Sequence, residues 1–183
     1  MAGKYRGRVW KFGDNLSGDD GILDFSAVRD HSQVFDAKTL SKMCFATINS
    51  KFQEEVKQGD IVVGGASFAK PAHDQVVVGI QAAGIEAILC ESCEARFVRK
   101  GFNIGIPIIV CPGITELVEQ DQTLEVDLAA GLVTNIDTGV TLETNACPDR
   151  LLEMLELGGV IPYLAQHFDR GDGNKDSPPR AAG

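Results

Sequence analysis

The fold is decided by residues 61–111, which begin Ile61-Val62-Val63-Gly64-Gly65-Ala66-Ser67-Phe68-Ala69-Lys70-Pro71. The apolar run at the start predicts a buried strand, and the glycine pair and the proline predict a tight loop over Gly64–Pro71. A helix should follow from about Ala72 to Ala83, until Gly84 ends it.

The rest of this segment repeats the same order of elements. The sequence predicts a second apolar strand, Ile85 to Cys90, a helix near Ala95 to Phe102, and a third short strand, Pro107 to Cys111. Alternating strands and helices are typical of a parallel sheet with helices packed on its faces, so we expect an α/β fold. Ligands of such sheets bind beyond the carboxyl ends of the strands, which directs attention to Gly64–Pro71 and Glu91–Asn103.

The flanking regions complete the expected domain. Alternation predicts a first strand over residues 4–12, and Asp36 is a plausible N-cap for a helix over Ala37–Cys44. After residue 111 we expect a small antiparallel meander, with strands over 124–128, 132–136 and 140–142, and then a helix that begins near Pro148 and ends at Gly158-Gly159. Residues 24–36 show no period and are consistent with an ordered loop or a mobile lid. From Asp169 onward we expect a disordered tail, which gives one domain over 1–168 and a tail over 169–183.

Composition narrows the class of protein. The chain has 183 residues, 44% of them hydrophobic and 23% charged, which suits a soluble globular protein. Its formal charge of −9 repels a phosphate backbone, so we expect no nucleic-acid partner. The sequence holds no apolar run of membrane-span length and starts without a signal-peptide core, so we expect no membrane association and a cytoplasmic location. Five cysteines without framework spacing favour a reducing compartment.

Motifs in three stretches follow one another in a specific order and spacing. They are Val9-Trp10-Lys11-Phe12-Gly13-Asp14-Asn15-Leu16 with Gly18-Asp19; Ala83-Gly84-Ile85 to Glu91-Ser92 with Phe97, Arg99, Asn103, Gly105 and Pro107; and Leu151–Leu164 with Gly158-Gly159. Together they resemble the small subunit of isopropylmalate isomerase (3-isopropylmalate dehydratase), the swivel domain of the aconitase superfamily. The resemblance covers about residues 7–165. It implies a three-layer swivelling domain with a mainly parallel sheet, flanking helices and the antiparallel meander.

One loop departs from the family pattern. Family members carry a glycine-rich loop that ends Ser-Ser-Arg-Glu-His, in which a serine acts as the base and the arginine holds a substrate carboxylate. Here Phe68 matches the family phenylalanine, but the loop continues Ala69-Lys70-Pro71-Ala72-His73 and is one residue shorter. The serine pair and the arginine are therefore missing, which predicts a substrate shifted away from isopropylmalate.

Lys70 and His73 are the main candidates at this loop. A helix start favours an anion, and Lys70 could add the positive charge that a di- or tricarboxylate needs; a solvated loop lysine is the alternative. Lysine is a point charge, so it would orient a carboxylate less tightly than arginine. His73 could replace the missing serine as acid or base; a water-exposed first-turn histidine is the alternative.

Four further residues are weaker candidates. Ser67 could hydrogen-bond the substrate or only its own backbone, and Phe68 is assigned to substrate binding with it. Asp19 matches a family aspartate, which implies a supporting role in catalysis, although a turn aspartate would look the same. Arg99 could support the substrate loop or lie on a helix surface.

Cys90-Glu91-Ser92-Cys93 suggests metal or redox chemistry only weakly. A single cysteine pair, without a second pair or a histidine at ligand spacing, predicts no metal site, and a cysteine that ends a buried strand is more often a packed thiol. Gly64-Gly65 lacks the third glycine of a dinucleotide fingerprint.

The resemblance implies a definite activity. It implies a hydro-lyase subunit that dehydrates and rehydrates a malate-like hydroxy acid together with a large subunit. That partner would hold a 4Fe–4S cluster acting as a Lewis acid, and this chain would hold none of its ligands. Two alternatives remain open at this point. One is a non-catalytic binding or regulatory protein of the same fold, and the other is a stand-alone nucleotide-binding domain.

Overall fold

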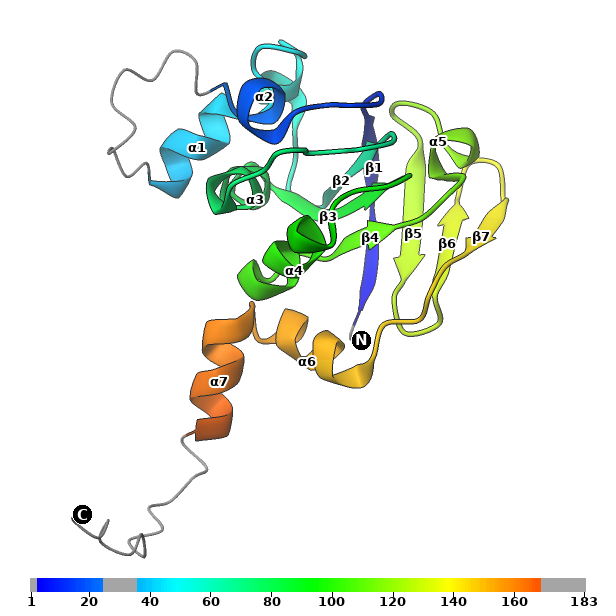
Figure 1. Cartoon of the computed structure of the whole chain (residues 1–183). Helices are drawn as coiled ribbons and strands as arrows, with labels where there is room; N and C mark the ends of the chain where they lie inside the picture. Colours follow the sequence, from blue (N-terminus) through cyan, green and yellow to red (C-terminus); the bar gives the residue numbers. More distant parts are fainter. Residues whose placement is uncertain (1–2, 25–35, 169–183) are drawn as a thin grey trace, which may run out of the picture.

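The computed structural model describes residues 3–24 and 36–168 (Figure 1). Strands and helices alternate through the first two thirds of the chain, and a meander and two helices complete it. In order the elements are β1 (Lys4–Lys11), the π-helix η1 (Gly18–Ile22), α1 (Ala37–Met43), α2 (Phe52–Glu55), β2 (Asp60–Gly64), α3 (Asp74–Ala82), β3 (Ile85–Cys90), α4 (Ala95–Ile104), β4 (Ile108–Val110), α5 (Ile114–Leu117), β5 (Thr123–Asp127), β6 (Leu132–Asn135), β7 (Thr141–Glu143), α6 (Asp149–Glu156) and α7 (Val160–Phe168).

All seven strands form one mixed sheet in the order β4-β3-β2-β1-β5-β6-β7. Strands β1 to β4 run parallel, with Val9 opposite Ile61 and Val63 opposite Leu89. Strand β5 pairs with β1 in the antiparallel sense and starts the β5-β6-β7 meander. Both the parallel core and the antiparallel extension predicted from the sequence are confirmed.

The sheet separates two hydrophobic clusters. On one face, Val62 and Ile88 pack with side chains from α1 and α3; on the other, Ile61, Val63 and Leu89 pack with α5, α6 and the meander. Figure 1 shows the resulting layers of helix, sheet and helix. Because β2 and β3 are buried on both faces, their sequences are continuous apolar runs rather than alternating ones.

Helix α3 begins at Asp74, two residues later than predicted. Ala72 and His73 are held instead by neighbouring loops: the Ala72 carbonyl accepts a hydrogen bond from Lys100 Nζ at 3.0 Å, and the His73 N–H donates to Asp19 Oδ1 at 3.2 Å. His73 therefore occupies the N-cap position with extended backbone. Sequence pattern alone does not report these tertiary bonds.

Other helix ends agree with the sequence signals. Asp36 caps α1, because its side chain accepts a hydrogen bond from the Thr39 N–H at 2.7 Å. Gly158 and Gly159 both have positive φ and end α6, with their N–H groups bonded back to carbonyls of the last turn. The ordered loop or mobile lid considered for residues 24–36 has residues 25–35 outside the described chain, and the tail predicted from residue 169 lies wholly outside it.

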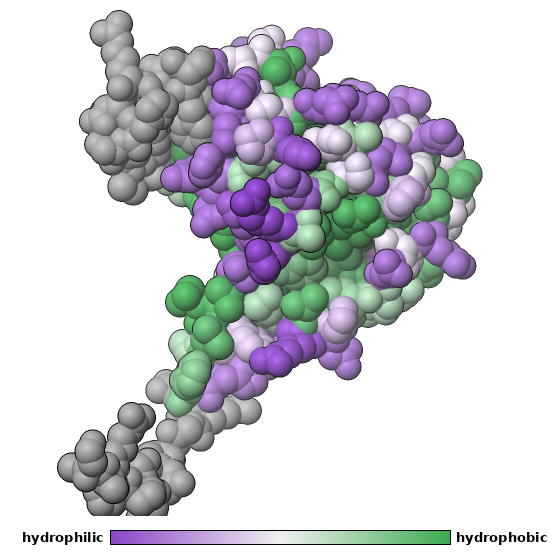
Figure 2. All heavy atoms as spheres, viewed as in Figure 1, coloured by the Kyte–Doolittle hydropathy of each residue, from purple (hydrophilic) through white to green (hydrophobic). Residues whose placement is uncertain are grey.

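Helix α7 is an element that the pattern did not mark. It follows the glycine pair at once, and Pro162 is tolerated because it lies in the first turn. Ile161 and Phe168 are 73% and 75% exposed on it. Figure 2 shows the hydrophobic residues gathered along α7, in contrast to the hydrophilic surface over much of the domain.

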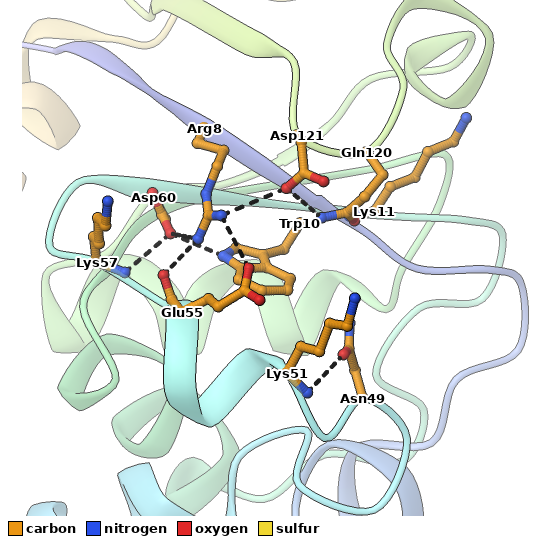
Figure 3. Close-up of polar contacts among 10 residues, drawn as sticks. All are labelled: Arg8, Trp10, Lys11, Asn49, Lys51, Glu55, Lys57, Asp60, Gln120 and Asp121. Atoms are coloured by element: carbon orange, nitrogen blue, oxygen red, sulfur yellow. Dashed lines mark hydrogen bonds and ion pairs between the residues drawn. The ribbon is translucent and has the colours of Figure 1, made fainter.

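A buried carboxylate, Asp60, links β1 to β2 (Figure 3). It lies at the opposite end of β2 from the loop that follows this strand. Asp60 is only 4% exposed, and its Oδ2 accepts hydrogen bonds from Trp10 Nε1 at 2.8 Å, the Lys57 N–H at 3.0 Å and Arg8 at 3.1 Å. Arg8 also contacts Asp121 at 3.5 Å and stacks over Trp10. A buried charge is tolerated here because each of its hydrogen bonds is made by a donor fixed in the fold.

Candidate functional site

The loops after β1 and β2 are joined at the carboxyl edge of the parallel strands. The Asn15 N–H donates to the Ala66 carbonyl at 2.7 Å, and the Ala66 N–H donates to Asp14 Oδ1 at 2.7 Å. Farther along, the Ala69 N–H donates to the Leu16 carbonyl at 2.8 Å. The segment Gly64–Pro71 is therefore held in one conformation by the first loop of the chain, as a binding loop requires.

Ser92, in the loop after β3, holds the same segment from the other side. Its carbonyl accepts the Phe68 N–H and its Oγ accepts the Ser67 N–H, both at 2.9 Å. Phe68 is fully buried, and its ring lies against Gly64 and 6.3 Å from the Phe97 ring. The side chain of Phe68 thus anchors the loop in the core and offers no exposed surface to a substrate, unlike the contact predicted from the sequence.

Lys70 projects from the tip of this loop. Its side chain is 60% exposed, and its Nζ lies 3.7 Å from Glu94 Oε1. Ser67 and Ala69 have positive φ on either side of Phe68, a backbone conformation that costs energy for residues other than glycine and that the surrounding hydrogen bonds enforce. The loop therefore buries Phe68 while it presents the Lys70 ammonium to solvent.

His73 and Asp19 form a close pair beside this loop. The His73 Nδ1 lies 2.7 Å from Asp19 Oδ2; the histidine side chain is 72% exposed and the aspartate side chain 15%. Because a carboxylate only accepts, it favours the tautomer with the proton on Nδ1 and leaves Nε2 outward as a possible proton acceptor. The structure therefore places Asp19, for which the resemblance implied a supporting role in catalysis, next to His73.

Acidic groups already lie at the start of α3. Asp19 Oδ1 accepts the N–H of His73, and Asp74 in the first turn forms a 2.8 Å ion pair with Lys100. The sequence predicted that this helix start favours an anion together with Lys70, but the anions nearest to it are the chain's own carboxylates. Positive charge for a ligand has to come from side chains.

Two basic residues of α4 behave differently. Lys100 is largely covered and bridges to the Ala72 carbonyl and to Asp74, so it ties α4 to the start of α3. Arg99 is exposed and makes no hydrogen bond or ion pair within residues 3–24 and 36–168. The structure brings Lys70, His73, Ser67 and Asp19 into one set of joined loops; Arg99 stands outside this set of contacts.

Glu91 is a site residue whose role the sequence did not reveal. Its Oε2 accepts the Gly113 N–H at 2.7 Å, and its Oε1 accepts the Thr115 N–H at 2.8 Å and the Thr115 hydroxyl at 2.6 Å. Burial alone would raise the pKa of Glu91, but these hydrogen bonds outweigh it and lower the pKa below the ordinary value. The carboxylate locks the loop after β3 to the start of α5.

A cavity of about 320 Å³ adjoins the joined loops at Asp14. Its lining combines apolar and polar side chains from the end of β1, the following loop and the segment between α1 and α2: Lys11, Phe12, Gly13, Asp14, Leu16, Ile48 and Asn49. Lys70 is not among the lining residues. Within the part of the chain that the structure describes, no group of three or more His, Cys, Asp and Glu side chains is arranged to hold a metal ion.

Comparison with known proteins places the chain in a family, although no family model matches it. It is 36% identical over 160 residues to the isopropylmalate/citramalate isomerase small subunit of Methanocaldococcus jannaschii, an alignment covering 87% of this chain and 92% of the relative. It is 32% identical to the 3-isopropylmalate dehydratase small subunit 1 of Methanopyrus kandleri, with 90% and 95% covered.

A solved structure agrees with these relatives. The crystal structure of 3-isopropylmalate dehydratase (leuD) from Methanocaldococcus jannaschii superposes with a TM-score of 0.80 and 26% identity, over 91% of this chain and 96% of that one. No helix among the described residues is long and apolar enough to cross a membrane. The chain belongs to the family of 3-isopropylmalate dehydratase (isopropylmalate isomerase) small subunits, which are subunits of a hydro-lyase.

Proposed function

We propose that this chain acts with an iron–sulfur large subunit to dehydrate and rehydrate a substituted malate-like hydroxy acid. One relative is named an isopropylmalate/citramalate isomerase small subunit and another a 3-isopropylmalate dehydratase small subunit, and both names support a larger partner. The described residues contain no group of side chains suited to hold a metal, so in this proposal the 4Fe–4S cluster belongs to the partner. When bound there, it supplies a Lewis acid for the substrate hydroxyl.

Lys70 is proposed to bind a substrate carboxylate. Its contact with Glu94 is 3.7 Å long and exposed, and exposed ion pairs contribute about 1 kcal/mol or less, so a substrate can displace it. An ammonium makes a less directional contact than the paired bonds of a guanidinium. This supports a substrate other than isopropylmalate itself, and citramalate is a suitable first test because one relative carries that name.

His73 is proposed to move the proton, and Asp19 to position it. The 2.7 Å contact between Nδ1 and Asp19 orients the ring and leaves Nε2 to face the substrate. Ser67, on the same loop, could hydrogen-bond a second carboxylate or hydroxyl oxygen. The observation that carries the proposal is the placement of the His73–Asp19 pair beside the exposed Lys70 loop, in a chain that aligns with 92% of an isomerase small subunit.

The experiment is anaerobic co-expression with the iron–sulfur large subunit of the same organism, followed by purification and assay. Substituted malates, including citramalate and 3-isopropylmalate, are tested through the absorbance of the unsaturated acid. We expect Lys70→Ala to raise KM and Lys70→Arg to restore part of the affinity, whereas His73→Gln lowers kcat by about 100-fold or more. Lys51→Ala, an exposed lysine on another loop, is the matched control.

One observation favours a second function. Lys70 and His73 both already have acidic partners in the chain, as a binding or regulatory protein without catalysis would allow. A complex that forms with the large subunit but turns over none of the acids, and is unchanged by Lys70→Ala and His73→Ala, would establish that alternative.

A further inference from the structure

The turn between β3 and α4 holds two thiols in different environments. Cys90 ends β3 and is fully buried, paired with Gly64 of β2 on one side and Val110 of β4 on the other. Cys93 is only half-buried; it packs against the same hydrophobic cluster as Cys90, and its backbone forms an isolated bridge with Phe68. One thiol is therefore fixed in the sheet, whereas the other lies in a turn.

The pKa values of the two thiols also differ. The side-chain hydrogen bond between them, assisted by burial of Cys90, raises the pKa of Cys90, and the same bond lowers the pKa of Cys93. Cys147 is also half-buried, but burial raises its pKa. A half-buried thiol in a turn next to a fully buried thiol at the end of a strand is the arrangement of a reactive pair, in which the second sulfur resolves the oxidised first one.

We propose that Cys90 and Cys93 form a dithiol that a peroxide oxidises to a disulfide, and that this oxidation loosens the loop Gly64–Pro71. The chemistry of the two thiols is independent of the function proposed above. Only the consequence for turnover rests on that function.

The reaction balances with hydrogen peroxide as the oxidant. The Cys93 sulfur attacks one peroxide oxygen; the S–O bond forms, the O–O bond breaks, and the departing hydroxide takes the Cys93 thiol proton to become water. The Cys90 sulfur then attacks the sulfenic sulfur of Cys93. The S–S bond forms, the S–O bond breaks, and the second hydroxide leaves with the Cys90 proton as water. Two thiols are oxidised and one peroxide is reduced to two waters.

Formation of this bond must move the turn. A disulfide bond is about 2.05 Å long, much shorter than the separation of two sulfurs that are not bonded. Cys90 is held by strands on both sides, so the movement falls on Cys93 and on Ser92 before it. Ser92 carries the hydrogen bonds to the Ser67 and Phe68 N–H groups, and these bonds should weaken.

The test uses the full chain, reduced and then titrated with hydrogen peroxide. Peptide mass spectrometry after alkylation of the remaining thiols should find a Cys90–Cys93 disulfide, and Cys93→Ser should abolish it. In Cys90→Ser, dimedone should trap a sulfenic acid at Cys93 faster than at Cys147, because burial raises the pKa of the Cys147 thiol.

Hydrogen exchange supplies the second measurement. Oxidation should speed exchange of the Ser67 and Phe68 amides, and peroxide should leave both unchanged in Cys93→Ser. Cys147→Ser is the matched control and should oxidise like the unmodified chain. If Cys90→Ser does not fold, disulfide mapping and the Cys93→Ser variant still decide the matter.

Two results would overturn the proposal, each in a different part. If Cys90 and Cys93 stay reduced at peroxide doses that oxidise the methionines, the dithiol chemistry is wrong. If the disulfide forms without any change in amide exchange at Ser67 and Phe68, the link to the loop is wrong. Neither measurement needs a substrate or a large subunit, so failure here is separate from failure of the proposed function.

Discussion

Removal of the buried carboxylate at Asp60 should destabilise the fold strongly. In Asp60→Ala the Trp10 Nε1–H and the Lys57 N–H lose their acceptor, at 2.8 and 3.0 Å respectively. Each buried donor left without a partner costs about 1–3 kcal/mol. Arg8 adds less to the loss, because it keeps contacts with Glu55 and Asp121 (Figure 3). We therefore expect a loss of about 3 kcal/mol, or about 6–12 °C in Tm for a chain of this size.

Two variants test the magnitude. Asp60→Asn keeps an oxygen acceptor but loses the charge, so its loss should be about half as large. Asp121→Asn removes the negative charge of the other carboxylate that contacts Arg8. The Asp121 side chain is 61% exposed, so this change should cost less than about 1 kcal/mol.

Urea unfolding followed by circular dichroism measures all three variants, and the fluorescence of Trp10, the single tryptophan, gives a second probe. The reasoning fails if Asp60→Ala is no less stable than Asp121→Asn. That result would mean that water satisfies the donors as well as the carboxylate does.

Three further predictions follow from other parts of the structure. The folded state lowers the pKa of Glu91, so the ionised side chain stabilises the fold above the ordinary pKa of 4.5. This contribution is lost as the pH falls through the lower folded-state pKa. Glu91→Gln should therefore flatten this part of an acid unfolding curve. Burial raises the pKa of Tyr5 to about 12 from 10.0, so stability should fall as the pH rises from about 10 to 12, and Tyr5→Phe should remove that fall in alkaline melts. A methyl group at Gly64 would meet the Phe68 ring at 2.2 Å, so Gly64→Ala should lower Tm by several degrees, whereas Gly13→Ala, where the added methyl meets no atom within 4 Å, should change it little.

Sequence and structure give different information about Lys70 and His73. Lys70 and His73 were identified because they stand where a resemblance shows a missing serine and arginine. What the structure adds is their partners. Glu94 faces Lys70, and Asp19 faces His73 across 54 residues of sequence. No local pattern specifies such pairs, because the order of the strands decides which loops meet.

The same distinction explains the residues whose roles were misjudged or missed. Phe68 was taken as a substrate contact, but the close approach to Gly64 and the bonds to Ser92 turn its ring into the core. Glu91 belongs to a motif that resembles the family, but its role depends on the start of α5 lying within hydrogen-bond distance. Cys90 was expected to be a packed thiol, and it is fully buried.

The sequence by itself determined the α/β class, the positions of the strands and most helices, and the family, because these depend on local periodicity, caps and the spacing of motifs. Tertiary structure alone decided where α3 starts, which carboxylates lie against its first turn, and how the loops after β1, β2 and β3 join. These features arise from hydrogen bonds between segments distant in the chain. Such bonds exist only once the parallel strands are in register and their carboxyl ends meet at one edge of the sheet.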